Sequence, residues 1–168
     1  DGVVDWAPVL GWRQVGLAKV LRGACGLPVV AENDANALAI AEHRYGDARG
    51  TSAMVAINLG NGIGAGIIAG GSLYRGHTAA AGEIGYMLLG TDSLRQTYAG
   101  FGDIETRVGA EGIARRSAEV GLADDVAGPL TAATVFELAR QGHRTALALV
   151  DEISDELAIA LANVAAVL

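Results

Sequence analysis

The stretch that decides the fold is Ala53-Met-Val-Ala-Ile-Asn-Leu59, followed by Gly60-Asn-Gly-Ile-Gly-Ala-Gly66 and Ile67-Ile-Ala-Gly-Gly71. An apolar, partly β-branched run enters a segment in which every second residue is glycine, and a second apolar run leaves it for a Gly-Gly pair. Because β-branched residues favour strands and glycine permits sharp turns, this pattern predicts a β-hairpin or meander. Its turn carries few side chains, so a charged ligand can reach the backbone amides.

Two familiar phosphate-binding motifs are excluded by what surrounds these glycines. A P-loop closes on a Lys-Ser/Thr pair before a helix, whereas Ala65-Gly-Ile-Ile68 stands at that place here. A dinucleotide fingerprint lies between a strand and a helix, but this segment is followed by a second strand-like run. Two interpretations stay open: a hairpin that holds a phosphate between its strands, and a glycine-rich turn without a ligand.

Composition limits the class of protein. The chain has 168 residues, 51% of them apolar and 18% charged, which is typical of a well-packed globular domain. Its formal net charge of −7 argues against nucleic-acid binding by this segment itself. Cys25 is the single cysteine, so no intrachain disulfide or cysteine metal cluster is expected. A single cysteine fits a reducing compartment, so we expect a cytoplasmic protein. With no apolar run long enough to span a bilayer, we expect no membrane contact.

Helical and extended patterns alternate along the chain. Apolar spacing and capping signals predict helices over residues 15–23, 32–45, 103–108, 111–120, 131–142 and 143–168. Short apolar runs predict strands over 27–31 and 87–89, and residues 1–12 are expected to form a turn-rich lead-in. The last helix would be roughly 35 to 40 Å long and has no stop signal. We therefore expect a piece of a larger protein.

Four stretches in order carry a resemblance to a known family. They are Ala7-Pro-Val-Leu-Gly-Trp12, Val29-Val-Ala-Glu-Asn-Asp-Ala-Asn36, Leu59-Gly-Asn-Gly-Ile-Gly-Ala-Gly66 and Ala81-Gly-Glu-Ile-Gly-Tyr86. Together they resemble the ROK family of repressors, open reading frames and sugar kinases, over nearly the whole chain. The resemblance implies an α/β fold of the actin-like ATPase (ribonuclease H-like) type, with a mixed β-sheet flanked by helices. Residues 1–168 would form one domain, the C-terminal sugar-binding lobe, with the N-terminal lobe and any winged helix outside this chain.

The resemblance also implies roles for individual residues. Asp34 matches the general base that takes a proton from the sugar hydroxyl, and Asn33 matches a residue that hydrogen-bonds the sugar. Glu83 and Glu105 match glutamates that contact sugar hydroxyls, and Tyr86 stands at a histidine position that serves the sugar. The residues alone favour Asp34 as a helix cap. They also allow Glu83 to be a helix cap or a partner in an internal hydrogen bond.

By the same resemblance the nucleotide phosphates would be lined by Gly60, Asn61, Gly62 and Gly64, with Asn61 where the kinases have threonine. The family's Cys-X-Cys-Gly-X-X-Gly-Cys segment is replaced by Arg95-Gln-Thr-Tyr-Ala-Gly-Phe-Gly-Asp-Ile-Glu105. Because a structural zinc site needs four N, S or O ligands, we predict no zinc and no other bound metal.

Two functions are consistent with these residues. The first is the sugar-sensing effector domain of a ROK transcriptional regulator, which would reach DNA only through a domain outside this chain. The alternative is an ATP-dependent hexose kinase, and only then are ATP and Mg²⁺ expected cofactors. The family's first phosphate loop, Asp-X-Gly-Gly-Thr, does not occur in the chain, so the fragment alone should not turn over ATP. A small-molecule sugar is the expected partner, and self-association into a homo-oligomer is expected from the family.

Overall fold

A three-stranded antiparallel sheet lies at the centre of the molecule. The computed structural model describes residues 2–7, 10–98, 100–126 and 128–168. The sheet has the order β3 (Ala53–Leu59), β4 (Ile63–Ala69) and β5 (Ser72–Tyr74). The pairing of β3 with β4 runs from Ala53 opposite Ala69 to Leu59 opposite Ile63. The predicted hairpin is thus confirmed, and residues 60–62 form its turn, called the hairpin tip below.

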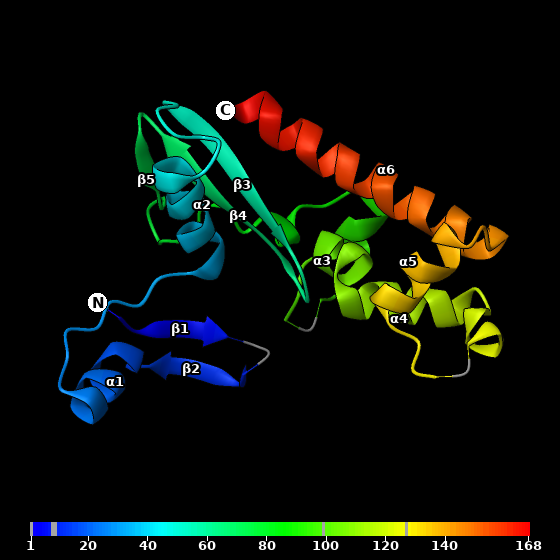
Figure 1. Cartoon of the computed structure of the whole chain (residues 1–168), viewed down its shortest axis with the longest axis horizontal. Coiled ribbons are helices and arrows are strands. Elements are labelled where there is room, and N and C mark those ends of the chain that lie inside the picture. The colour runs from blue at the N-terminus through cyan, green and yellow to red at the C-terminus, as the bar shows by residue number, and fades with distance from the viewer. Residues whose placement is uncertain (1, 8–9, 99, 127) are drawn as a thin grey trace.

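The two faces of this sheet are covered by different layers (Figure 1). Helix α2 (Asp34–Tyr45) lies on one face, where Ala39, Ala56 and Ile68 are buried together. The other face contributes Ile63 and Ala65 to a larger core. That core is shared with four helices: α3 (Asp103–Val108), α4 (Ala110–Glu119), α5 (Ala132–Arg140) and α6 (Arg144–Val167).

The expected helices are present, but the first begins at Leu17 and continues past Gly23 to Cys25, where residues 15–23 were predicted. Other helix ends follow the local signals. The Thr131 hydroxyl accepts a hydrogen bond from the Thr134 amide at 3.2 Å and caps α5. Gly142, with φ +86°, separates α5 from α6, whose 24 residues span about 36 Å. Short 3₁₀ turns connect some of the longer elements, among them η2 (Ile84–Tyr86), η3 (Thr91–Arg95) and η4 (Leu122–Asp125).

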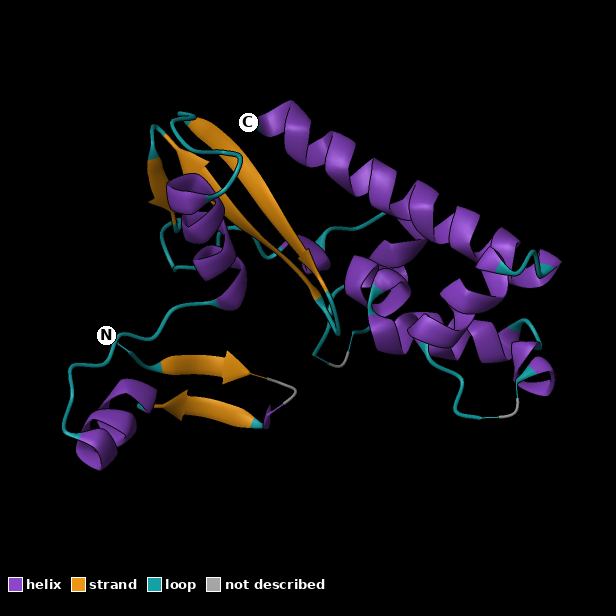
Figure 2. Ribbon diagram, viewed as in Figure 1, coloured by secondary structure: helices purple, strands orange, loops and turns teal. Residues whose placement is uncertain are grey.

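The N-terminal region differs from the expected turn-rich lead-in. An antiparallel hairpin forms instead from β1 (Val4–Ala7) and β2 (Trp12–Val15), followed by α1 (Leu17–Cys25). Pro8 lies outside the described residues. Figure 2 shows this small unit as a separate group of elements, which residues 26–33 connect to α2.

Two predicted strands are wrong. Residues 27–31 are not in a strand, and Leu27 and Val30 are 64% and 92% exposed. Residues 87–89 are also outside any strand, although Met87 and Leu89 pack against the larger core. An extended apolar run becomes a strand only where a neighbouring strand takes its backbone hydrogen bonds, and neither sheet of the described residues includes these segments. The α/β class is confirmed, but the strand pairs described are antiparallel, where a mixed sheet was expected.

One further observation concerns membranes. Among the described residues, every helix is too short or too polar to cross a bilayer.

Candidate functional site

Close packing of α2 on β4 determines where Asp34 lies. A side chain at Gly66 would collide with the backbone of Ala35, and one at Gly64 would lie 3.3 Å from the Ala35 methyl group. Because glycine stands at both positions, the first turn of α2 lies directly on the hairpin. Asp34 therefore reaches across to β3, where Asn58 Nδ2 donates a hydrogen bond to its Oδ2 at 3.1 Å.

Asn33 and Asp34 have separate tasks at the start of α2. Asn33 is the cap, since its Oδ1 accepts a hydrogen bond from the Asn36 amide at 3.0 Å. Asp34 is the first helical residue, and its Oδ1 accepts from the amide of Ala35 at 2.9 Å. Asp34 is thus not the cap that the residues alone allowed. Its carboxylate is exposed, yet donors on both oxygens fix its orientation.

Glu83 is brought to the same region by a glycine turn. The Gly82 carbonyl accepts a hydrogen bond from the Ala65 amide at 2.8 Å, and a side chain at Gly82 would collide with Ala65. The Glu83 side chain does not cap the turn that follows it. Although this carboxyl group keeps contact with solvent, burial of its surroundings and the nearby charge of Asp34 raise the pKa of Glu83.

Glu105 and Tyr86 complete the group from the α3 side. The Glu105 carboxylate lies beside the hairpin tip, where any side chain at Gly62 would strike it. Burial and the charge of Glu83 raise the pKa of Glu105, although the amides of Gly102 and Ile63 oppose this shift. The Tyr86 hydroxyl donates to the Gly100 carbonyl at 3.1 Å.

The pKa of Tyr86 is raised by burial and by the charges of Glu83 and Glu105. Glu83 therefore links the group, because the charge of Asp34 acts on Glu83 and the charge of Glu83 acts on Tyr86 and Glu105. Three carboxylates in one region are strong hydrogen-bond acceptors, which suits a ligand rich in hydroxyl groups.

The hairpin tip is anchored to the helical layer. The Gly60 amide donates to the Gly62 carbonyl at 2.9 Å, and the Gly60 carbonyl accepts from the Ala110 amide at 3.2 Å. A side chain at Gly109 would press on the Asn61 carbonyl. The Gly60 amide is thus used within the tip. Phosphate binding by residues 60, 61, 62 and 64 stays a prediction.

Three polar residues of the site are absent from the set predicted from the sequence. Glu32 accepts hydrogen bonds from Arg75 Nε at 3.2 Å and Asn36 Nδ2 at 3.1 Å. Burial opposes its ionisation, but donors from Arg75, Asn36 and Asn33 lower the pKa of Glu32. Asn58 was signalled only as a polar residue near the end of an apolar run, and Arg75 by no pattern.

Comparison with known proteins places these residues in a family. The model of the ROK family matches residues 2–168. The chain belongs to the ROK family. A glucokinase from Halalkalibacterium halodurans is 36% identical over an alignment of 174 positions, which covers 98% of this chain and 53% of that protein. A xylose repressor from Caldicellulosiruptor bescii is 26% identical over an alignment of 171 positions, which covers 97% of this chain and 43% of the repressor.

A solved structure gives the same relationship. The crystal structure of a ROK family glucokinase from Streptomyces griseus, in complex with glucose and AMPPNP, superposes with a TM-score of 0.81 and 31% identity. The match covers 98% of this chain and 57% of that chain. This ROK chain therefore spans about half the length of the relatives that it matches.

The ROK family's zinc-binding segment is replaced in this chain, and the residues in its place do not supply a set of zinc ligands. Among the described residues, no group of three or more His, Cys, Asp and Glu side chains is arranged to hold a metal ion. Asp103 and Tyr98, which lie in the replacing segment, are hydrogen-bonded to each other at 2.8 Å. These residues do not fit a tetrahedral zinc ion.

Proposed function

We propose that this chain is the sugar-binding half of an ATP-dependent hexose kinase, in which Asp34 takes the proton from the attacking sugar hydroxyl. The observation that carries the proposal is the Asp34 carboxylate, exposed at the start of α2 and fixed by Asn58 and Ala35. A general base must reach a substrate hydroxyl in a defined direction, and a fixed, exposed carboxylate meets that requirement. The similarity to two glucokinases supports the same assignment.

Sugar recognition in this proposal falls to the residues around Asp34. Glu83 and Glu105 accept hydrogen bonds from sugar hydroxyls, and Asn33 and Tyr86 complete the contacts. Neighbouring charges and burial raise the pKa of both glutamates, so their ionised forms are held in an unfavourable environment. A ligand that donates several hydrogen bonds relieves this unfavourable energy. Binding is therefore selective for polyols over apolar molecules.

Phosphoryl transfer needs groups from outside this chain as well. The hairpin tip, with Asn61 and its glycines, would line the phosphates, and ATP and Mg²⁺ would supply the transferred group and neutralise its charge. The catalytic unit is then the full-length protein, which we expect to be a cytoplasmic homo-oligomer.

A second candidate function is a sugar-sensing transcriptional regulator. The observation in its favour is Tyr86, which stands at the histidine position and whose hydroxyl is already bonded to the Gly100 carbonyl. The similarity to a xylose repressor points the same way. In this case Asp34 binds a hydroxyl without removing its proton, and a domain outside this chain contacts DNA.

Release of ADP by the full-length protein distinguishes the two candidates. The assay supplies ATP, Mg²⁺ and a panel of hexoses and N-acetylhexosamines to the wild type, to Asp34→Asn and to a matched control, Asp47→Asn, whose side chain is exposed. We expect sugar-dependent turnover that falls by roughly 100-fold or more in Asp34→Asn alone. Turnover that survives this substitution would refute the role of Asp34. No turnover, with a sugar still raising the melting temperature, would support the regulator.

A further inference from the structure

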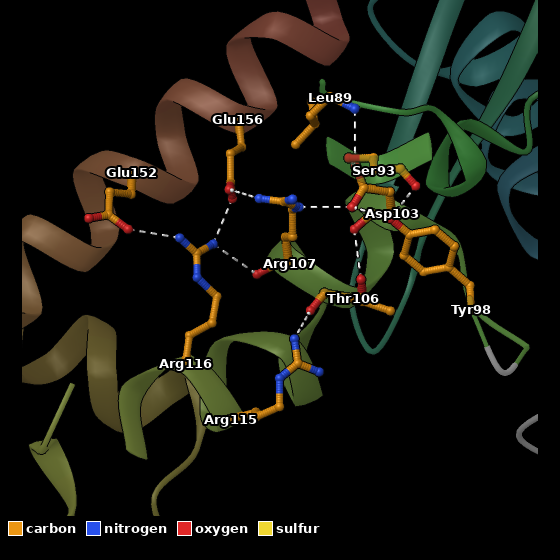
Figure 3. Close-up of polar contacts among 10 residues, drawn as sticks. All are labelled: Leu89, Ser93, Tyr98, Asp103, Thr106, Arg107, Arg115, Arg116, Glu152 and Glu156. Atoms are coloured by element: carbon orange, nitrogen blue, oxygen red, sulfur yellow. Dashed lines mark hydrogen bonds and ion pairs between the residues drawn. The ribbon is translucent and has the colours of Figure 1, made fainter. Parts of the chain in front are cut away.

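The segment between Tyr86 and Glu105, two residues of the proposed sugar site, is held together by one buried carboxylate. Asp103 is 2% exposed and accepts four hydrogen bonds (Figure 3). Its Oδ2 accepts from the Leu89 amide at 3.0 Å and from the Ser93 hydroxyl at 2.5 Å. Its Oδ1 accepts from the Tyr98 hydroxyl at 2.8 Å and from Arg107 Nε at 2.9 Å. This set is called the Asp103 network below.

The four donors come from different parts of the chain. Leu89 and Ser93 belong to the segment after η2, Tyr98 to the segment before α3, and Arg107 to α3 itself. A buried carboxylate is costly unless its acceptor positions are filled, so the donors and Asp103 hold one another in place. Movement of the 89–98 segment would remove three of the four donors and leave Asp103 with Arg107 alone.

The network continues outward into the helical layer. Arg107 Nη1 donates to Glu156 at 3.1 Å, and the same carboxylate accepts from Arg116 Nη1 at 2.6 Å. Arg116 also contacts Glu152 at 2.9 Å. Asp103 is therefore connected through Arg107 to α4 and α6, as the dashed lines in Figure 3 show.

The position of this network in the chain corresponds to the zinc segment of the ROK pattern. When the Gly-Cys pair that ends Cys-X-Cys-Gly-X-X-Gly-Cys is placed on Gly102 and Asp103, the other two cysteine positions fall on Gln96 and Tyr98. Two of the three positions are thus occupied by the donor and the acceptor of one hydrogen bond. A charge-assisted hydrogen bond joins the same two points of the chain that a metal would join.

We propose that the Asp103 network replaces a structural metal in this chain and positions Tyr86 and Glu105 for the sugar. Glu105 follows Asp103 by two residues on α3, and the Tyr86 hydroxyl is bonded to Gly100, between Tyr98 and Asp103. Asp103 and Tyr98 are positioning residues, because they act through these two side chains. The effect on sugar rests on the proposed function, whereas the replacement of the metal does not.

The test uses the full-length protein and begins with its metal content. We expect elemental analysis to find far less than one zinc per chain, and the melting temperature to be unchanged by a chelator. Stoichiometric zinc, or a melting temperature lowered by the chelator, would overturn the proposal.

The second part of the test compares Tyr98→Phe with Tyr45→Phe, a matched control whose ring is 81% exposed. We expect Tyr98→Phe to raise the KM or Kd for sugar by roughly threefold to tenfold and to leave kcat nearly unchanged, since one hydrogen bond to a charged group is lost. Amides at 86–98 should also exchange hydrogen faster in Tyr98→Phe than in the control. Equal sugar affinity in the two variants would refute the positioning role.

The hydrogen-exchange measurement keeps the two proposals separable. If the wild type binds no sugar, the proposed function fails, but metal content and exchange at 86–98 still decide whether the Asp103 network holds this segment. Asp103→Asn is a stronger perturbation, and Tyr98→Phe gives the answer if Asp103→Asn does not fold.

Discussion

Acid should lower the free energy of unfolding through protonation of Asp103, and the variant Asp103→Asn can separate this contribution from those of other groups. Burial opposes ionisation of this carboxyl group, but donors from Ser93, Leu89, Arg107 and Tyr98 lower its pKa from 3.8 to about 2. Because the pKa is lower in the folded state, the ionised group stabilises the fold above its unfolded pKa. This contribution is lost as the pH falls from about 4 towards 2.

The magnitude follows from the two pKa values. The difference between 3.8 and about 2, at about 1.36 kcal/mol for each pH unit, corresponds to roughly 2 kcal/mol at neutral pH. Between about pH 6 and pH 3 roughly half of this, about 1 kcal/mol, should be lost. For a domain with about 5–15 kcal/mol of total stability, that is a measurable fraction.

The measurement is urea unfolding followed by circular dichroism at about pH 6, 5, 4 and 3, for wild type, Asp103→Asn and the exposed control Asp92→Asn. Asp103→Asn removes the charge that Arg107 faces, so it should be less stable than the wild type at pH 6. The difference should narrow by about 1 kcal/mol on acidification, because asparagine does not titrate. A difference that stays constant over this range would show that folding does not perturb Asp103, and would refute the reasoning.

Other substitutions test the packing, the site charges and a helix cap. Gly66→Ala should destabilise the fold by about 1–3 kcal/mol because its methyl group would press on the backbone of α2, and Gly64→Ala should cost less; urea unfolding compares them. Glu83→Gln should raise the melting temperature at neutral pH while weakening sugar binding, because burial and the charge of Asp34 raise the pKa of Glu83. Its ionised form therefore costs stability as pH rises through that pKa, so the gain should vanish near pH 4, and a lower melting temperature at neutral pH would contradict this. Thr131→Ala should cost about 1 kcal/mol by removing the cap of α5, measured by thermal unfolding.

Elements with local signals could be predicted from the sequence. The glycine-rich hairpin at 53–69 and the cap at Thr131 depend on residues within a few positions of one another. The segments 27–31 and 87–89 carry the same apolar pattern as strands, but a strand also requires a partner, which no local pattern records. The hairpin of β1 and β2 was missed because four residues are too few to show a clear alternation.

In the candidate site, too, residues within one motif could be predicted, whereas contacts between residues far apart in the sequence could not. Asn33 and Asp34 are neighbours in one motif, and the family resemblance named both. Asn58 is 24 residues from Asp34, and Arg75 is 43 residues from Glu32, so their hydrogen bonds depend on how the sheet and α2 pack. The role of Asp103 was missed for a related reason: Leu89 and Ser93 are 14 and 10 residues away from it, although Arg107 is a local partner four residues along the same helix.

The two faces of the central sheet are packed against different layers, and the residues of the proposed site come from both. Each layer can therefore change in sequence without the other. Asp34 comes from α2, whose glycine and alanine contacts with β4 leave almost no freedom to change residues without moving the helix. Glu83, Tyr86 and Glu105 come from the opposite layer, where Gly82 and Gly102 make close backbone contacts and a core of larger apolar side chains lies alongside. If the proposed function holds, substitutions in that second layer alter which sugar is bound while Asp34 keeps its position. The proposal therefore implies that a lineage carrying this fold can change its ligand without rebuilding its reactive centre, and that directed evolution of sugar preference should concentrate on residues 83–105.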